Sequence, residues 1–252
     1  MNLKGIIKSA AVRAKLNRPP VIIGGCGRSG TTLLLAVLSA HPRFYSIPFE
    51  TYVLCPEAHK PHRIDPDAEL DPRSLFRIVP FQKILFNRRN RLCEKTPKNV
   101  VFFGRILRAF SERVRLVHIV RDGRDVITSR HPKRPGEYWT SPQRWINDVS
   151  SGVEYIDHPC VSTVRYEDLI TDFENTIDKL LYEIGEDLCE EVLSFTEHAT
   201  VRNGPWVDNP RLQGLYAGSI GRWRREEHRE AVKKFMQDPM ASTLLERLGY
   251  EI

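Results

Sequence analysis

The sequence predicts a single-domain, P-loop-type α/β protein in which helices cover both faces of a mainly parallel central sheet, giving three layers. Short apolar runs rich in β-branched residues alternate with stretches whose apolar residues recur at helical spacing. The first run leads directly into a glycine-rich loop and a helix. The 252 residues fit one domain of ordinary size, without an internal repeat, low-complexity tract or domain boundary. We therefore treat residues 1–252 as one domain.

The chain opens with a basic, weakly amphipathic segment, residues 1–19. This segment lacks the continuous apolar stretch of a signal peptide or a membrane span, and no later segment supplies one. We expect either a cytoplasmic protein or a soluble catalytic portion of an anchored parent.

A strand, a tight loop and a helix are predicted over residues 21–38, VIIGGCGRSGTTLLLAVL. Val21–Ile23 form the apolar run, glycines crowd the loop, and leucines and valine recur at helical spacing behind it. Such a loop turns backbone N–H groups inward, and the helix adds unpaired donors and a partial positive charge. The sequence therefore predicts a site for a phosphate or a group of similar shape.

This loop differs from the nucleotide-triphosphate motif G-x-x-x-x-G-K-[ST] in one informative position. Gly25 and Gly30 fit the spacing, but Thr31 stands where the lysine that bridges the β- and γ-phosphates belongs. Arg28 inside the loop supplies the cation instead, and its fork suits one tetrahedral oxyanion. The pattern favours a ligand with a short 5′ chain over ATP or GTP. The alternative is a glycine-rich turn that only allows close packing of strand and helix.

The remaining elements are expected in the following order: a loop over 41–49, an irregular loop or lid over 55–71, a helix over 73–86, a short strand over 92–94, a helix over 98–110, a buried strand over 114–120, helices over 125–130 and 141–157, a strand over 161–165, helices over 173–185 and 187–198, an irregular stretch over 200–221, and closing helices over 224–236 and 240–248. Strands separated by helices imply a parallel sheet.

A second anion site is predicted where the strand over 114–120 ends. Arg121 follows that strand directly, and Ser129 lies on the first turns of the next helix. Because ligands gather beyond the carboxyl ends of parallel strands, this arginine and hydroxyl are expected beside the first loop. They suggest a second phosphate group. The alternative is a local ion pair between Arg121 and Asp122 that closes the turn.

Composition limits the function classes without choosing one. The net charge of +6 is compatible with nucleic acid, a membrane surface or polyanionic ligands, and also with a mildly basic solvated surface. The five cysteines are scattered without a C-x-x-C pair, which argues against a zinc site or a disulfide framework and favours a reducing compartment. Cys26 lies in the anion loop, where we expect a packing residue rather than an oxidation-sensitive thiol.

Several motifs together resemble those of sulfotransferases that use 3′-phosphoadenosine 5′-phosphosulfate (PAPS), most closely the tyrosylprotein and bacterial sulfotransferase branch. GGCGRSGTTLLLAVLSAHP resembles their 5′-phosphosulfate loop, and IVRDGRDVITS resembles their 3′-phosphate motif. The branch also shows counterparts of Glu50-Thr51, of EKTPKN with Lys95, of RYEDL over 165–169, and of AGSIGRW ending at Trp223. The matches extend from residue 21 to about 225, which is most of the chain.

The resemblance implies an in-line transfer of the sulfuryl group from PAPS to a hydroxyl or amine acceptor, without a metal ion. It implies the following roles: Gly27, Arg28, Ser29, Gly30, Thr31 and Thr32 around the 5′-phosphosulfate; Arg121, Ser129 and Arg222 on the 3′-phosphate; Tyr166 or Trp223 against adenosine; Lys95 on the departing oxygen; and Glu50 as the base that takes the acceptor proton. Positioning and fixed positive charge are expected to supply most of the catalysis.

Alternatives stay open at several points. His59 or His62 in the lid is the fallback base, because other sulfotransferase branches use histidine. The second enzyme candidate is a nucleotide kinase or NTPase with a degenerate phosphate loop. A third reading is a module for RNA or another polyanion built on Arg88, Arg89 and Arg91, whose simpler explanation is a solvated helix end; we expect no nucleic-acid partner.

The acceptor and the oligomeric state are left open. The segments expected to line the acceptor pocket, 51–71, 130–140 and 200–213, carry the least pattern. Their side chains suit a carbohydrate, a peptide tyrosine, a lipid or a small molecule.

Overall fold

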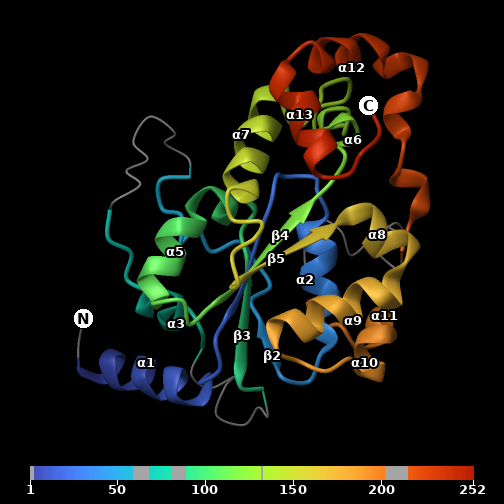
Figure 1. The fold of residues 1–252 in the computed structure, drawn as a ribbon. Coiled ribbons are helices and arrows are strands. Elements are labelled where there is room, and N and C mark those ends of the chain that lie inside the picture. Colours follow the sequence, from blue (N-terminus) through green and yellow to red (C-terminus); the bar gives the residue numbers. More distant parts are fainter. Residues whose placement is uncertain (1–2, 59–67, 81–88, 132, 202–214) are drawn as a thin grey trace.

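A five-stranded parallel sheet forms the centre of the protein in a computed structural model that describes residues 3–58, 68–80, 89–131, 133–201 and 215–252 (Figure 1). The strand order is β2-β3-β1-β4-β5, and every pairing is parallel. The strands are β1 (Val21–Gly24), β2 (Phe44–Ser46), β3 (Arg91–Lys95), β4 (Arg115–Val120) and β5 (Val161–Arg165). The predicted α/β fold class is confirmed.

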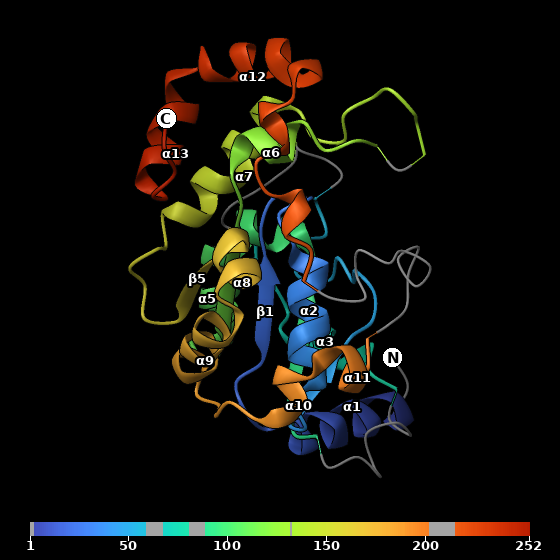
Figure 2. The same cartoon turned by 90° about the vertical axis from the view of Figure 1, so that its right-hand side faces the viewer.

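Helices cover both faces of this sheet, and a third group lies beyond its carboxyl edge (Figures 1 and 2). One face carries α2 (Thr31–Ala40), α8 (Tyr166–Thr171), α9 (Phe173–Ile184), α10 (Glu190–Leu193) and α11 (Phe195–His198). The other carries α1 (Leu3–Lys15), α3 (Arg73–Arg77), the 3-10 helix η2 (Pro97–Phe102) and α5 (Phe103–Phe110). The third group contains α6 (Gly123–Ile127), α7 (Pro142–Val153), α12 (Arg229–Met236) and α13 (Pro239–Arg247). Short 3-10 turns η4 (Ala217–Ser219), η5 (Arg222–Arg224) and η6 (Glu226–His228) lead into α12.

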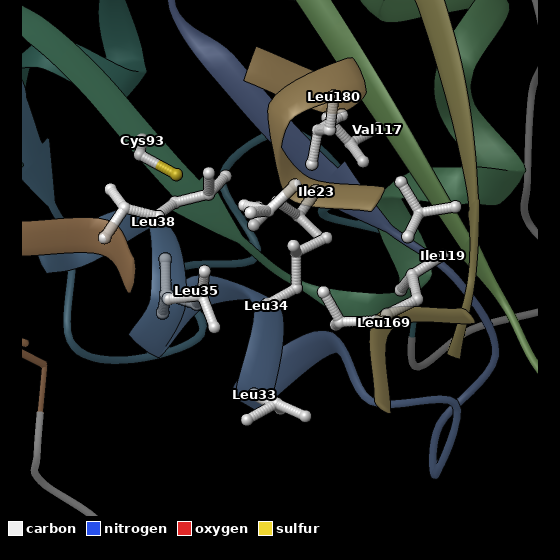
Figure 3. Packing of buried hydrophobic residues seen from close by; sticks show 14 of the residues in the cluster. Ile23, Leu33, Leu34, Leu35, Leu38, Cys93, Val117, Ile119, Leu169 and Leu180 are labelled. Carbon is white, nitrogen blue, oxygen red and sulfur yellow. The ribbon is translucent and has the colours of Figure 1, made fainter. Parts of the chain in front are cut away.

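The central strand β1 contributes to the hydrophobic core on both faces. Ile23 packs in the cluster formed with α2 and α9, whereas its neighbour Ile22 packs in the cluster formed with α3 and α5. Successive side chains of a strand point to opposite faces, so a strand in the middle layer must be apolar throughout. Figure 3 shows Ile23 among Leu34, Val117 and Leu180. This burial holds the end of β1, and the loop that follows it, in a fixed position.

Three elements are not predicted from the sequence, and the first is helix α1 (Leu3–Lys15), which covers most of the basic segment 1–19. The expected loop over 41–49 contains β2, an edge strand of three residues that pairs with β3. So short a run between Pro42 and Pro48 shows no usable alternation, and only its parallel partner makes it a strand. Helix α8 begins at Tyr166 directly after β5, where no helix was predicted.

Several predicted helices differ in length. The helix expected over 73–86 ends as α3 at Arg77, ahead of Pro80, which cannot donate a backbone hydrogen bond; residues 81–86 lie outside the described part. The helices expected over 98–110 and 187–198 are each divided into two shorter elements. The helix expected over 141–157 ends at Val153, and that expected over 224–236 starts with 3-10 turns before α12. The irregular stretch expected over 200–221 contains η4 in its described part. The predicted strands end within two residues of the observed ones.

None of the helices in the described ranges is both long and apolar enough to cross a bilayer.

Candidate active site

The glycine-rich loop lies between the end of β1 and the first turn of α2, at the carboxyl edge of the sheet. Gly30, the N-cap of α2, has a φ of 96°, and a Cβ there would lie 2.5 Å from Cδ2 of Tyr166. Only glycine fits both the left-handed backbone and this close approach. Arg28 also adopts a positive φ of 76°, which is uncommon for a residue with a side chain. The loop is thus held in a conformation that local preferences alone do not favour.

Polar groups in this loop are available to an anion. Ser29 is buried, and its Oγ has no hydrogen-bond partner within the described residues. Thr31 and Thr32 occupy the first turn of α2, where helix N–H groups lack intrahelical acceptors and the dipole is positive. A buried hydroxyl without a partner is costly unless a ligand or water satisfies it. The loop therefore fits a group with several acceptor oxygens.

Three guanidinium groups gather beside the loop. Arg121 is buried, and it donates to the Arg28 carbonyl at 3.1 Å and to the Ser219 carbonyl at 2.5 Å. Burial, and then the charges of Arg121 and Arg222, lower the pKa of the Arg28 side chain. Three cations brought so close repel one another, and a bound anion relieves that repulsion. The structure thus brings Arg28, Arg121 and Arg222 together at the carboxyl edge of the sheet.

The late turn η4–η5 is fastened to α6 by the buried carboxylate of Asp125. Its Oδ2 accepts from the Gly221 N–H at 2.8 Å, and its Oδ1 accepts from the Trp223 N–H at 3.0 Å. These bonds carry Arg222 to Ser129, so that Arg222 Nη2 and Ser129 Oγ lie 3.5 Å apart. Arg121, Ser129 and Arg222, which the sequence groups in one subsite, thus lie close together, while Asp125 is an additional residue that the sequence-based prediction does not include. The second aspartate of the RDGRD motif was the signal for it.

The two aromatic residues named for adenosine differ in their surroundings. Tyr166 is buried, donates or accepts a 2.7 Å hydrogen bond with Ser219 Oγ, and lies under the Arg121 guanidinium at 4.4 Å. Trp223 is half-buried, with the guanidinium carbons of Arg124 and Arg224 at 4.1 and 4.4 Å from its ring centre. Tyr166 therefore supports Arg121, while Trp223 lies at the surface of the turn.

Lys95 and Glu50 form an ion pair on the other side of the loop. Lys95 Nζ donates to Glu50 Oε1 at 2.8 Å, and the Tyr52 hydroxyl donates to Glu50 Oε2 at 2.7 Å. Burial raises the pKa of the Glu50 carboxyl, but the Lys95 charge and the two hydrogen bonds outweigh it, so the pKa is lowered. The carboxylate is therefore ionised at neutral pH, and with an exposed fraction of 35% its side chain is reachable from solvent.

A buried polar network fixes the loop that carries Glu50. The fully buried carboxylate of Glu94 on β3 accepts from Thr51 Oγ1 at 2.9 Å, from Thr96 Oγ1 at 2.6 Å and from Asn99 Nδ2 at 2.7 Å. Thr96 Oγ1 also accepts from the Thr51 N–H at 3.1 Å. Because Thr51 is bound on both sides, Glu50 is held beside Lys95. The sequence analysis had used only the lysine of EKTPKN.

Other sequence candidates are placed less directly. Cys26 is buried, and burial followed by the nearby Asp148 charge raises the pKa of its thiol, as expected for a packing residue. Arg91 is also buried and donates to Glu186 Oε1 at 2.8 Å, so it is not part of a solvated helix end.

His59, His62 and Arg88 lie outside the described residues. Within the described ranges, no group of three or more His, Cys, Asp or Glu residues could hold a metal ion.

Comparison with known proteins identifies the family. The model of the sulfotransferase family matches residues 19–190, more than two thirds of the chain. The chain belongs to the sulfotransferase family. It is an enzyme that transfers a sulfuryl group, as the resemblance of its motifs implied.

Solved structures show the same fold at low identity. The sulfotransferase domain of the curacin biosynthetic pathway is 15% identical and superposes with a TM-score of 0.62 over 93% of this chain and 99% of the domain. The sulfotransferase domain of the Synechococcus PCC 7002 olefin synthase is 18% identical, with a TM-score of 0.60 over 93% and 96%. Mouse sulfotransferase SULT7A1, crystallised with PAP, is 12% identical, with a TM-score of 0.50 over 94% of each chain. No curated protein matches this sulfotransferase.

Family membership decides between the two enzyme classes considered. Nothing supports the kinase or NTPase alternative beyond the shared architecture of the phosphate loop. Of the three arginines named for a polyanion-binding module, Arg91 is a buried, ion-paired residue of β3.

Proposed function

We propose that this sulfotransferase uses PAPS as its sulfuryl donor and holds both phosphate groups of the nucleotide at the carboxyl edge of the sheet. The observation that carries the proposal is the gathering of three arginines around a loop that has threonine where an ATP-binding loop has lysine. The PAP complex of the structurally similar mouse enzyme supports the same ligand.

In this proposal the 5′-phosphosulfate lies on the loop and the first turn of α2. The groups that hold it are the backbone N–H groups of Gly27, Arg28 and Gly30, the Arg28 guanidinium, and the hydroxyls of Ser29, Thr31 and Thr32. Backbone donors at a helix N-terminus are matched to phosphate oxygens, and a guanidinium can bind two of them at once. The buried Ser29 hydroxyl then gains the partner that it lacks within the described residues.

The 3′-phosphate is assigned to Arg121, Ser129 and Arg222. The contacts of the late turn support this assignment, because Asp125 binds the turn and so brings Arg222 close to Ser129. Adenosine is assigned to the surface next to Trp223, while Tyr166 supports Arg121 from below. The glycine-rich loop and the subsite of Arg121, Ser129 and Arg222 are two distinct phosphate positions. Two such positions fit a 3′,5′-bisphosphate better than a linear triphosphate.

The proposed reaction is a direct displacement at sulfur. The acceptor oxygen or nitrogen attacks the sulfur while the bond from sulfur to the bridging oxygen of the 5′-phosphate breaks, and that oxygen keeps the bonding electrons. Glu50 accepts the proton released by the acceptor, and Lys95 stabilises the negative charge on the departing oxygen. The products are the sulfated acceptor and PAP.

The ion pair between Lys95 and Glu50 links donor binding to base strength. With Lys95 at 2.8 Å, the carboxylate is ionised but weakly basic, because the ammonium lowers its pKa. A donor that draws Lys95 toward its bridging oxygen weakens this pair, and the pKa of Glu50 rises. The base thus becomes stronger when the donor is in place.

The experiment is a calorimetric titration of the protein with PAP, without magnesium. We expect micromolar binding by the wild-type protein and a loss of at least tenfold in affinity for Arg28→Ala, which removes a charge-assisted contact. Arg108→Ala is the matched control, because this arginine lies on α5. Absence of heat with the wild-type protein, or magnesium-dependent binding of ATP instead, would contradict the proposed donor.

A further inference from the structure

A second group of cations lies on the side of the loop away from Arg121 and Arg222. Ser141 caps α7, so Arg144 projects from the first turn of this helix. The buried carboxylate of Asp148, one turn later, accepts from Lys98 Nζ at 2.6 Å. Lys95, the partner of Glu50, is the third cation on this side of the loop.

Arg144 lies directly against the backbone of the loop. A Cβ on Gly27 would be 3.3 Å from Arg144 Nη2, which is tighter than most side-chain contacts, and 3.5 Å from Trp139 Nε1, which is an ordinary contact. The guanidinium therefore packs over the bare Cα of Gly27, one residue before Arg28. It is also near the reacting groups: after burial, the Lys95 pair and the Tyr52 hydrogen bond, the charge of Arg144 further lowers the pKa of Glu50.

The charge of Arg144 is only partly compensated. Lys95 is paired with Glu50, and Lys98 is paired with Asp148 at short distance. Arg144 Nε lies 3.5 Å from Asp148 Oδ2, and this buried nitrogen makes no hydrogen bond within the described residues. Three cations thus share two carboxylates, which leaves an excess positive charge beside Gly27 for a further anion.

We propose that Arg144 binds the sulfonate of the donor and so lets the enzyme distinguish PAPS from the product PAP. The inference rests on the proposed donor. The phosphates occupy the opposite side of the loop in that proposal, whereas the sulfonate points toward Lys95 and Glu50, where Arg144 lies. Once the sulfuryl group has left, PAP no longer reaches Arg144 and is held less tightly than the substrate.

The test compares the affinities for PAPS and PAP by calorimetry in the cold, in the absence of an acceptor. Arg144→Gln is expected to weaken PAPS binding about tenfold, as loss of a charged hydrogen bond does, and to change PAP binding less than twofold. Arg144→Lys is expected to retain part of the preference for PAPS. Gln143→Ala, on the same turn with a hydrogen bond to Asn147, is the control and is expected to change neither affinity.

Each other outcome has a distinct meaning. An equal loss for PAPS and PAP in Arg144→Gln places the residue on a phosphate and overturns the inference, and so does no loss for either ligand. If the wild-type protein binds neither ligand, the proposed donor itself fails. If Arg144→Gln does not melt cooperatively, the comparison is made with Arg144→Lys, and equal PAPS and PAP losses there also overturn the assignment.

Discussion

At the scale of single residues, the central feature is a carboxylate that is paired with a lysine and yet has the position of a base. Glu50 is bound by Lys95 at 2.8 Å and by Tyr52 at 2.7 Å, and each contact favours its ionised form. Each carboxylate oxygen has a further lone pair, so an acceptor can reach Glu50 while both contacts are kept. The two contacts can be tested separately.

Glu50→Gln is expected to bind PAP with wild-type affinity and to lower kcat by at least about 100-fold. The glutamine side chain has the same shape as glutamate, but its amide cannot take up the proton that the acceptor group releases. The measurement is transfer from labelled PAPS to an acceptor found by screening, together with PAP calorimetry. Full activity in Glu50→Gln would place the base elsewhere, with His59 and His62 next to be replaced.

Tyr52→Phe is expected to move the acid limb of the kcat/KM profile to higher pH. The hydroxyl stabilises the Glu50 carboxylate, so its removal raises the pKa of that carboxyl, and activity is lost at a higher pH as the pH falls. Tyr182→Phe, which changes an exposed tyrosine of α9, is the matched control. If the acid limb stays at the same pH or moves to lower pH, ionisation of Glu50 does not determine the acid limb of the kcat/KM profile.

At the scale of elements, the 3′-phosphate subsite depends on how the late turn is attached to α6. Asp125 accepts two backbone hydrogen bonds from residues about a hundred positions away in the chain. This attachment helps to bring Arg222 to Ser129, together with the bond from Arg222 Nε to the Ser219 carbonyl at 3.2 Å. The subsite is therefore expected to respond to a change that removes no ligand contact.

Asp125→Asn is expected to weaken PAP binding about tenfold, since the amide nitrogen cannot accept the N–H of Gly221 or Trp223, and a buried unpaired donor costs about 1–3 kcal/mol. The measurement is PAP calorimetry with thermal melting of the same samples. Asp122→Asn, which alters the pair with Arg124 instead, is the comparison. Wild-type PAP affinity in Asp125→Asn would show that the turn does not position the subsite.

The difference between local and distant contacts also explains what the sequence could predict. Arg28 and Thr31 follow β1 within a few residues, and Arg121 and Ser129 share one strand-to-helix turn, so spacing was enough to group each set. By contrast, the roles of Asp125, Glu94 and Arg144 depend on contacts with residues far away in the chain or on another element. The RDGRD motif marks Asp125 as a residue of interest, but neither a motif nor a periodicity shows which distant residues Asp125, Glu94 and Arg144 contact. Similarly, β2 becomes a strand only by pairing with β3.

At the scale of the whole molecule, stability is expected to depend on pH through a buried histidine. His118 on β4 is fully buried, and its ring nitrogens make no hydrogen bond in the described part of the chain. Burial lowers its pKa to about 3. The folded protein therefore keeps this ring neutral at pH values where the unfolded chain protonates it.

His118→Leu is expected to remove this dependence. Below the unfolded pKa of about 6.5, the histidine binds a proton in the unfolded state but not in the folded state. The free energy of unfolding of the wild-type protein therefore falls by about 2 kcal/mol between pH 7.5 and pH 5 through this group. Urea unfolding at both pH values measures the loss, and the variant is expected to lose correspondingly less, whatever its stability at pH 7.5. Equal losses in the two proteins would show that His118 is protonated in the folded state.

Every residue role proposed here requires a donor nucleotide that lies across the carboxyl edge of the sheet, and a crystal structure with PAP tests this most directly. We expect the 5′-phosphate on the backbone of Gly27 to Gly30, with Arg28 and the first turn of α2 around it. We expect the 3′-phosphate in contact with Arg121, Ser129 and Arg222. A nucleotide bound elsewhere, or one whose 3′-phosphate leaves Arg121 and Ser129 untouched, would contradict the account.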